Sequence, residues 1–148
     1  MHTEEQYQRA HQLSPRTPEP LINLGSLYIA EADERGIHRD DALALLSKAR
    51  DLLEESLQLK PASTGYYFLG LAYFKSDFNE EAETNLKHAL KMPTYPPAVR
   101  LILANLYIRL QKWPEALEQL DGYLLENPRS VDRTEVQNTR SKVIQRLR

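Results

Sequence analysis

The side chains that most often perform chemistry are few in this sequence, and their spacing does not favour a reactive site. The chain has no cysteine, so it has neither a thiolate nucleophile nor a sulfur-ligated zinc cluster. Its four histidines are His2, His11, His38 and His88. None of them has a partner at the i, i+4 spacing that places two metal ligands on one helix face. We therefore expect no metal site and no cofactor.

Carboxylate pairs are the second arrangement that could do chemistry, because two acids can serve as general acid and general base. The adjacent pairs are Asp40–Asp41, Glu54–Glu55 and Glu80–Glu81. They lie in amphipathic stretches or near expected helix N-termini, where acidic side chains complement the helix dipole. The sequence also lacks a Gly-rich phosphate loop and a Gly-x-Ser-x-Gly motif. We predict that this chain is not an enzyme.

Length and composition are those of an ordinary globular domain. The chain has 148 residues, of which 41% are hydrophobic and 27% charged. Its longest uncharged apolar run, Tyr66–Phe74, is far shorter than the roughly 20 residues of a membrane span. The polar and acidic start does not resemble a signal peptide. We expect a soluble protein without a membrane partner, and the compartment stays open.

The charge distribution gives no electrostatic reason to expect nucleic-acid binding. Net charge is −2, the difference between 19 basic and 21 acidic residues. Residues 129–148 are locally basic, and we interpret them as a solvated helix face, with a binding patch as the alternative.

The elements that must position any functional surface follow a repeat. The pattern Leu, small residue, x, x, Tyr occurs at residues 24–28, 69–73 and 103–107. The last two copies are offset by 34 residues, and Ala82 and Ala116 have the same offset. A fixed period of this length decides the architecture before any single helix does. The first copy is enlarged around residues 31–41, and Asp40 or Asp41 is the expected N-cap of its second helix.

This pattern resembles the tetratricopeptide repeat, a helix-turn-helix unit of 34 residues. The resemblance covers roughly residues 6–148. It implies an all-α fold, a right-handed superhelical array of antiparallel helix pairs. The small residue of each first helix is expected to face the alanine of the second, as with Gly70 and Ala82.

The resemblance also implies an organisation for residues 1–148 as a single domain. The expected parts are the second helix of a partial repeat (3–15), an enlarged repeat (18–61), two further repeats (63–96 and 97–130) and a C-terminal capping helix (131–148). Ser130 and an Asp132-x-x-Glu135 capping box are the expected start signals of the last helix. Tyr123 departs from the family, which has a small residue at that position.

In the family, the first helix of each repeat lines a concave groove that binds peptides. The groove positions correspond here to Ile22, Ile29, Tyr67, Leu71, Phe74, Lys75, Leu101, Asn105, Ile108 and Arg109. These residues are mostly apolar, so the resemblance implies an apolar or amphipathic peptide partner. Lys75 and Arg109 would flank it and take an acidic group. For Tyr67 and Phe74, packing between repeats is an equal alternative.

Some family members hold a C-terminal carboxylate with a clamp of lysine, asparagine and arginine. The clamp positions are here Ile22, Ser26, Phe68, Ala98 and Ile102. Recognition of chaperone tails by that clamp is therefore not expected.

Four functions compete at this point. The leading one is a non-catalytic interaction module or scaffold for a protein or peptide. The second is structural, with the chain stacking on copies of itself as a homo-oligomer or on further repeats. The third is an accessory domain of a larger enzyme. RNA binding is fourth, because helical repeats that read bases use polar side chains and this groove is mostly apolar.

Overall fold

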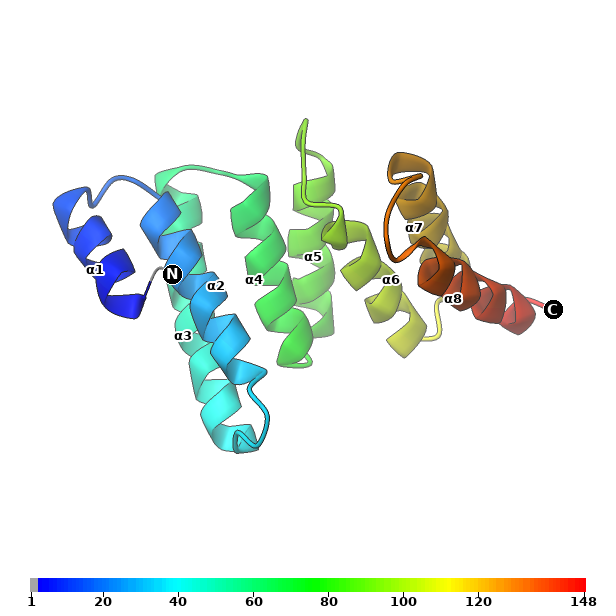
Figure 1. The fold of residues 1–148 in the computed structure, drawn as a ribbon, viewed down its shortest axis with the longest axis horizontal. Helices are drawn as coiled ribbons and strands as arrows, with labels where there is room; N and C mark the ends of the chain where they lie inside the picture. The colour runs from blue at the N-terminus through cyan, green and yellow to red at the C-terminus, as the bar shows by residue number, and fades with distance from the viewer. Residues whose placement is uncertain (1–2) are drawn as a thin grey trace. The chain divides into compact units, whose positions relative to one another are not determined.

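The computed structural model describes residues 3–148, and the sequence predictions for Met1 and His2 lie outside the described residues. Every regular element in residues 3–148 is an α-helix (Figure 1). The helices are α1 (Glu4–Leu13), α2 (Glu19–Ala32), α3 (Arg39–Leu59), α4 (Ser63–Lys75), α5 (Asn79–Leu90), α6 (Ala98–Arg109), α7 (Trp113–Glu126) and α8 (Arg133–Arg146). The prediction of an all-α fold is confirmed.

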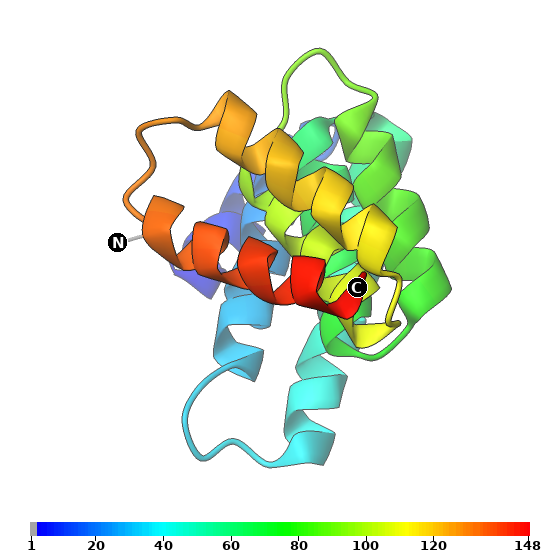
Figure 2. The same ribbon diagram turned by 90° about the vertical axis from the view of Figure 1, so that its right-hand side faces the viewer.

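The helices form two compact units, which we call unit 1, up to Tyr95, and unit 2, from Pro96. In unit 1, α2 pairs with α3 and α4 with α5, while α1 packs on α2 and α4 packs on α3. In unit 2, α6 pairs with α7, and α8 lies beside α7 (Figure 2). The predicted single domain and its repeat boundaries stay predictions.

Two hairpins of unit 1 are close-packed because a glycine faces a leucine. A Cβ atom on Gly25 would lie 2.8 Å from Cγ of Leu53, and one on Gly70 would lie 2.7 Å from Cγ of Leu86. Both leucines are fully buried. The prediction paired Gly70 with Ala82, whereas the atoms nearest to Gly70 belong to Leu86. Glycine is required here because any side chain would enter the space of a leucine.

The turns inside the second and third hairpins have the same backbone conformation. Asp77 and Gln111 both have a positive φ, of 63° and 58°. The amide of Phe78 donates to the carbonyl of Tyr73 at 2.9 Å, and the amide of Lys112 donates to that of Tyr107 at 2.8 Å. This is a Schellman C-cap in each case. Turns that are 34 residues apart in the sequence therefore have the same backbone geometry.

The first hairpin is longer than the second and projects beyond it (Figures 1 and 2). Its second helix, α3, has 21 residues, against 12 for α5. Gly36 in the turn has a φ of 86°, where only glycine is free of strain. The N-cap prediction was wrong: His38 holds that position, and Asp40 and Asp41 lie in the first helical turn, where they complement the dipole.

A buried tyrosine links α7 to the start of α8. Tyr123 is 5% exposed, and its hydroxyl donates to Oδ1 of Asp132 at 2.6 Å and contacts Oγ of Ser130 at 2.9 Å. Asp132 is the N-cap residue of α8, but its side chain makes no capping bond, so the predicted capping box is absent. Its carboxylate instead accepts from Tyr123 and Ser130, and these bonds hold the pKa of Asp132 below its usual value. The departure at Tyr123 thus orders the chain before α8.

Candidate functional site

Three predicted groove residues form a stripe along α4. Tyr67, Leu71 and Phe74 are spaced i, i+4 and i+7, which places them on one helix face. All three are partly exposed. Leu71 packs against the core of unit 1, and the ring of Tyr67 lies 4.9 Å from that of Phe68. Partial burial raises the pKa of Tyr67. The stripe is an apolar surface within reach of a partner.

Two predicted groove residues on α2 lie in the core instead. Ile22 is 7% exposed and Ile29 is 3% exposed, and both belong to the hydrophobic cluster formed by α2, α3 and α4. Both side chains are buried because α2 presents a wide apolar face to its neighbours in unit 1. A partner cannot reach side chains that are this deeply buried, so neither residue enters our proposal.

Lys75 is engaged within unit 1. Its Nζ atom lies 2.7 Å from Oδ2 of Asp33, the C-cap residue of α2. The sequence predicted that Lys75 takes an acidic group from a partner, but Asp33 already supplies a carboxylate. A partner would have to share or displace this ion pair.

The other four predicted groove residues lie on α6 in unit 2. Leu101 and Ile108 are partly exposed, and Asn105 and Arg109 are exposed. Leu101 and Asn105 line a small cavity of about 130 Å³, and α7, α8 and the residue before α8 supply the rest of its lining. Those contributions are Leu120, Asp132, Glu135, Val136 and Thr139. The Asp132 and Glu135 carboxylates make the α8 side of this cavity acidic.

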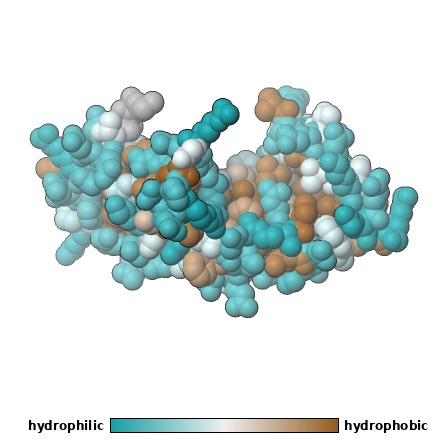
Figure 3. Space-filling model, turned by 90° about the horizontal axis from the view of Figure 1, so that it is seen from below, coloured by the Kyte–Doolittle hydropathy of each residue, from teal (hydrophilic) through white to brown (hydrophobic). Residues whose placement is uncertain are grey.

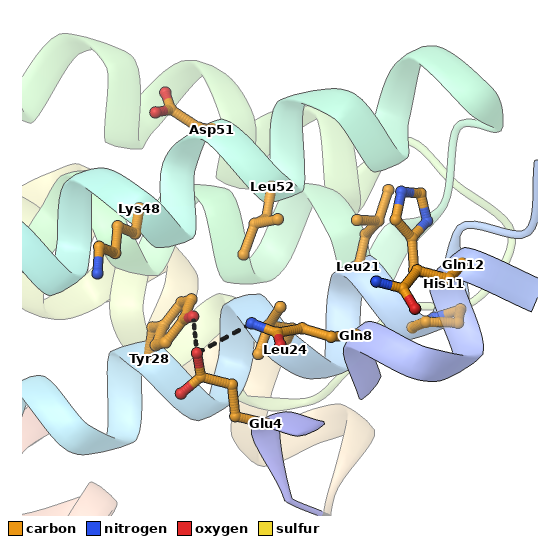
Figure 4. Close-up of a pocket in the computed structure, with 11 residues that line it drawn as sticks. Glu4, Gln8, His11, Gln12, Leu21, Leu24, Tyr28, Lys48, Asp51 and Leu52 are labelled. Atoms are coloured by element: carbon orange, nitrogen blue, oxygen red, sulfur yellow. Dashed lines mark hydrogen bonds between the residues drawn. The ribbon is translucent and has the colours of Figure 1, made fainter. Parts of the chain in front are cut away.

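A larger cavity, of about 530 Å³, lies among α1, α2 and α3 and was not predicted (Figure 4). Leu21, Leu24 and Leu52 supply apolar walls. At one end, the hydroxyl of Tyr28 donates to Oε1 of Glu4 at 2.6 Å. Burial and the Glu4 carboxylate raise the pKa of Tyr28 to about 12. This bond holds α1 against α2.

The opposite end of the same cavity is held by a weaker contact. Nε2 of His11 lies 3.7 Å from Oε1 of Glu55, while Nδ1 of His11 is buried without a hydrogen-bond partner. Lys48 of α3 lies at the Tyr28 end of the cavity, with Nζ 5.7 Å from the centre of the Tyr28 ring (Figure 4). The Tyr28–Glu4 and His11–Glu55 contacts join α1 to α2 and α3, and none of the side chains described at this cavity forms a nucleophile–base pair.

Within residues 3–148, no group of three or more His, Asp or Glu side chains is placed to hold a metal ion. None of the helices in the same range is long and apolar enough to cross a membrane. Hydrophilic residues cover most of the face in Figure 3, and hydrophobic residues gather in separate patches.

The comparison with protein families decides the assignment. Residues 73–143 match the family model described as tetratricopeptide repeat. Residues 73–143 therefore contain tetratricopeptide repeats. Such repeats are protein-interaction modules, and proteins built from them are generally non-catalytic scaffolds. No curated protein matches the chain by sequence.

Solved structures, two of them described as tetratricopeptide repeat proteins, share the fold of nearly the whole chain. A thermophilic protein of Thermus thermophilus has a TM-score of 0.81 at 23% identity, over 96% of this chain and 71% of that one. YrrB, described as having an unusual peptide-binding site, has a TM-score of 0.76 at 20% identity, over 96% and 66%. MamA has a TM-score of 0.69 at 19% identity, over 97% and 76%. These likenesses establish the tetratricopeptide-like helical fold.

Sequence reasoning missed the residues that hold α1. The contact between Tyr28 and Glu4 joins residues 24 positions apart, and no spacing rule connects them. The one available signal was the capping box at the start of α1, where Thr3 and Gln6 bond reciprocally and set the helix start.

Proposed function

We propose that this chain is a non-catalytic protein-interaction module that binds a peptide or amphipathic segment along the α4 stripe. The observation that carries the proposal is the partial exposure of Tyr67, Leu71 and Phe74 on one helix face. Apolar side chains gathered on the surface of a globular protein usually mark an interaction site. The peptide-binding site named for YrrB agrees with this type of function.

The chemistry of the stripe suits an apolar segment. Aromatic side chains provide large contact areas at low entropic cost, and tyrosine adds a hydroxyl that can bond to a peptide backbone. We propose that α6 of unit 2 contacts the same kind of partner, through Leu101, Asn105, Ile108 and Arg109. Asn105 is exposed and carries both a donor and an acceptor for peptide groups.

The test separates binding from stability with a matched control on the same helix. Tyr67→Ala and Phe74→Ala remove stripe residues, whereas Tyr66→Ala removes a ring that stacks on His88 at 5.0 Å. A partner captured from the source organism is identified, purified and titrated against each variant. We expect the two stripe variants to weaken binding by about 1–3 kcal/mol, the scale of an aromatic hot spot, with little change in melting temperature.

Two outcomes would contradict the proposal. If Tyr66→Ala weakens binding as much as Tyr67→Ala does, the stripe is not the contact surface. If the stripe variants lose several kcal/mol of folding stability and bind normally, Tyr67 and Phe74 act in packing.

A further inference from the structure

A tyrosine of α7 sets the position of a carboxylate at the small cavity of unit 2, which we call the unit 2 cavity. The hydroxyl of Tyr123 donates to Oδ1 of Asp132 at 2.6 Å, and the hydroxyl of Ser130 donates to the same oxygen atom. The Asp132 side chain makes no capping bond to α8. Its carboxylate is therefore oriented by Tyr123 and Ser130, and Asp132 lines the cavity together with residues of α6, α7 and α8.

No basic side chain balances the negative charge at this side of the cavity. The bonds from Ser130 and Tyr123 hold the pKa of Asp132 below its usual value, so this carboxylate is ionised at neutral pH. Both bonds end on Oδ1, and Oδ2 accepts no hydrogen bond from residues 3–148. Glu135, one turn further along α8, is exposed and has no ion-pair partner in that range either. The helix N-terminus supplies roughly half a positive charge, which leaves most of the charge of two carboxylates uncompensated.

The other walls of the unit 2 cavity are mostly apolar. They are supplied by Leu101 of α6, Leu120 of α7 and Val136 of α8. Leu120 and Val136 are buried, whereas Leu101 is partly exposed and Glu135 is exposed. The cavity thus combines buried apolar side chains with an acidic edge that water reaches.

Size and lining together indicate the kind of occupant. The volume of about 130 Å³ is below the roughly 300 Å³ at which small-molecule pockets begin, so a single side chain is the size of ligand to expect. Lysine and arginine lay their methylene groups along apolar surface and keep their charge in water, which matches both parts of the cavity. A metal ion fits less well, because calcium takes about six to eight oxygen ligands and residues 3–148 contain no group of three or more His, Asp or Glu placed to hold one.

We propose that the unit 2 cavity binds one lysine or arginine side chain of the partner peptide. The aliphatic stem packs against the three apolar side chains, and the cation lies beside the carboxylates of Asp132 and Glu135. Asn105, which is exposed and lines the same cavity, supplies an amide for the peptide backbone next to the basic residue. The inference rests on the proposed function, because Leu101 and Asn105 belong to the α6 surface proposed to contact the partner. It adds a specificity, namely a basic residue beside the apolar residues of the peptide.

The test uses the intact chain and two pools of synthetic hexapeptides. Every peptide has a random mixture of apolar and uncharged polar residues around one central residue, which is lysine in the first pool and norleucine in the second. Norleucine keeps most of the aliphatic stem and lacks the charge, so the difference between the pools measures recognition of the cation. We expect the lysine pool to bind about tenfold more tightly at low salt, and the difference to shrink at high salt.

Variants that remove one charge locate the binding site. Asp132→Asn and Glu135→Gln each remove a carboxylate of the cavity, and Glu118→Gln removes an exposed carboxylate of α7 that does not line it. We expect each cavity variant to weaken binding of the lysine pool about three- to tenfold and to leave the norleucine pool unchanged, whereas Glu118→Gln should change neither.

The two cavity variants differ in their risk to the fold. Asp132 bonds to Tyr123, so a thermal melt checks that Asp132→Asn still folds. Glu135 is exposed, and its side chain makes no hydrogen bond within residues 3–148. Binding by Glu135→Gln therefore reports on the charge alone.

Three outcomes overturn the inference: no binding of the lysine pool, equal binding of the two pools, or the same loss in Glu118→Gln as in Glu135→Gln. The proposed function is judged separately with Tyr67→Ala. If the norleucine pool binds, Tyr67→Ala weakens it and lysine gives no advantage, then the interaction module stands and the cavity inference fails. If binding of the lysine pool depends on Glu135 and neither pool depends on Tyr67, the cavity inference stands and the α4 stripe is not the contact surface.

Discussion

The Nζ atom of Lys75 lies 2.7 Å from Oδ2 of Asp33, which joins the end of α4 to the end of α2. The Lys75 side chain is 27% exposed and that of Asp33 is 57% exposed. Solvated pairs of this kind contribute about 0–1 kcal/mol. We expect Lys75→Met to lower the free energy of unfolding by less than about 1 kcal/mol, and high salt to reduce the difference. Denaturant unfolding at low and high salt measures it, and a larger loss that is insensitive to salt would assign the effect to packing.

Because a Cβ atom on Gly70 would meet Leu86, even a change to alanine is expected to lower the stability of unit 1. Gly70→Ala should destabilise unit 1 by about 1–3 kcal/mol through overpacking, less the roughly 0.5–1 kcal/mol that alanine gains in a helix. In Gly122→Ala the added Cβ meets the guanidinium of Arg100, at 2.7 Å. This group is the far end of a long side chain, although Glu126 and Gln119 bond to it, so a smaller change is expected. Thermal melts compare the two. Equal melting temperatures for both variants would refute the close approach of α4 and α5.

The positive φ of Gln111 predicts a stabilising substitution. A left-handed conformation costs a residue with a side chain about 1–2 kcal/mol, and glycine avoids this cost. Gln111→Gly should therefore raise the stability of unit 2 by roughly 1 kcal/mol, partly offset by the greater freedom of glycine in the unfolded chain. Gly36→Ala makes the reverse change at a φ of 86°, in open space, and should be destabilising. A gain in stability for Gly36→Ala would contradict this interpretation of the turns.

Two tyrosines predict a loss of stability in alkali. Burial, with hydrogen bonds to Glu4 and Glu54, raises the pKa of Tyr28 and Tyr73 from 10.0 to about 12. Because the folded chain favours the neutral phenol, this stabilisation is complete below pH 10 and is lost as the pH rises through about 12. The melting temperature should fall over that interval. The fall should be smaller in Tyr28→Phe and Tyr73→Phe, and a wild-type fall in both variants would exclude these two hydroxyls as its cause.

The link between Tyr123 and Asp132 predicts an effect at acid pH. Hydrogen bonds from Ser130 and Tyr123 lower the pKa of Asp132, so its contribution to stability is present above the unfolded pKa and is lost as the pH falls. Tyr123→Phe removes one of these donors and should raise the pKa of Asp132. An NMR titration of the Asp132 carboxyl measures the change. An unaltered pKa would show that the Tyr123 hydroxyl is not needed.

The sequence predicted the fold well because the repeat depends on local spacing. A leucine, a small residue and a tyrosine at fixed intervals define one helix face, and three copies of that face define the hairpins. The enlarged first hairpin was also predicted, since its extra residues continue the helical pattern. The N-cap at His38 was missed because it makes no side-chain capping bond, and Asp40 and Asp41 offered a stronger signal.

The burial of the groove residues could not be predicted from their spacing, because it depends on neighbouring helices. Ile22 and Ile29 have the residue type and spacing of groove residues, but contacts with α3 and α4 decide that they lie in the core. The pairing of Lys75 with Asp33 joins residues 42 positions apart, beyond any local rule. Tyr67 and Phe74 are partly exposed, and whether they bind a partner stays a prediction.

The most direct test of the interaction function is hydrogen exchange of the intact chain with and without its purified partner. Our account predicts slower exchange in residues 63–75, the helix that carries Tyr67, Leu71 and Phe74. In the Tyr67→Ala variant, the slowing in α4 should be smaller at the same partner concentration. Slower exchange confined to α3 and α5, with α4 unaffected, would contradict it.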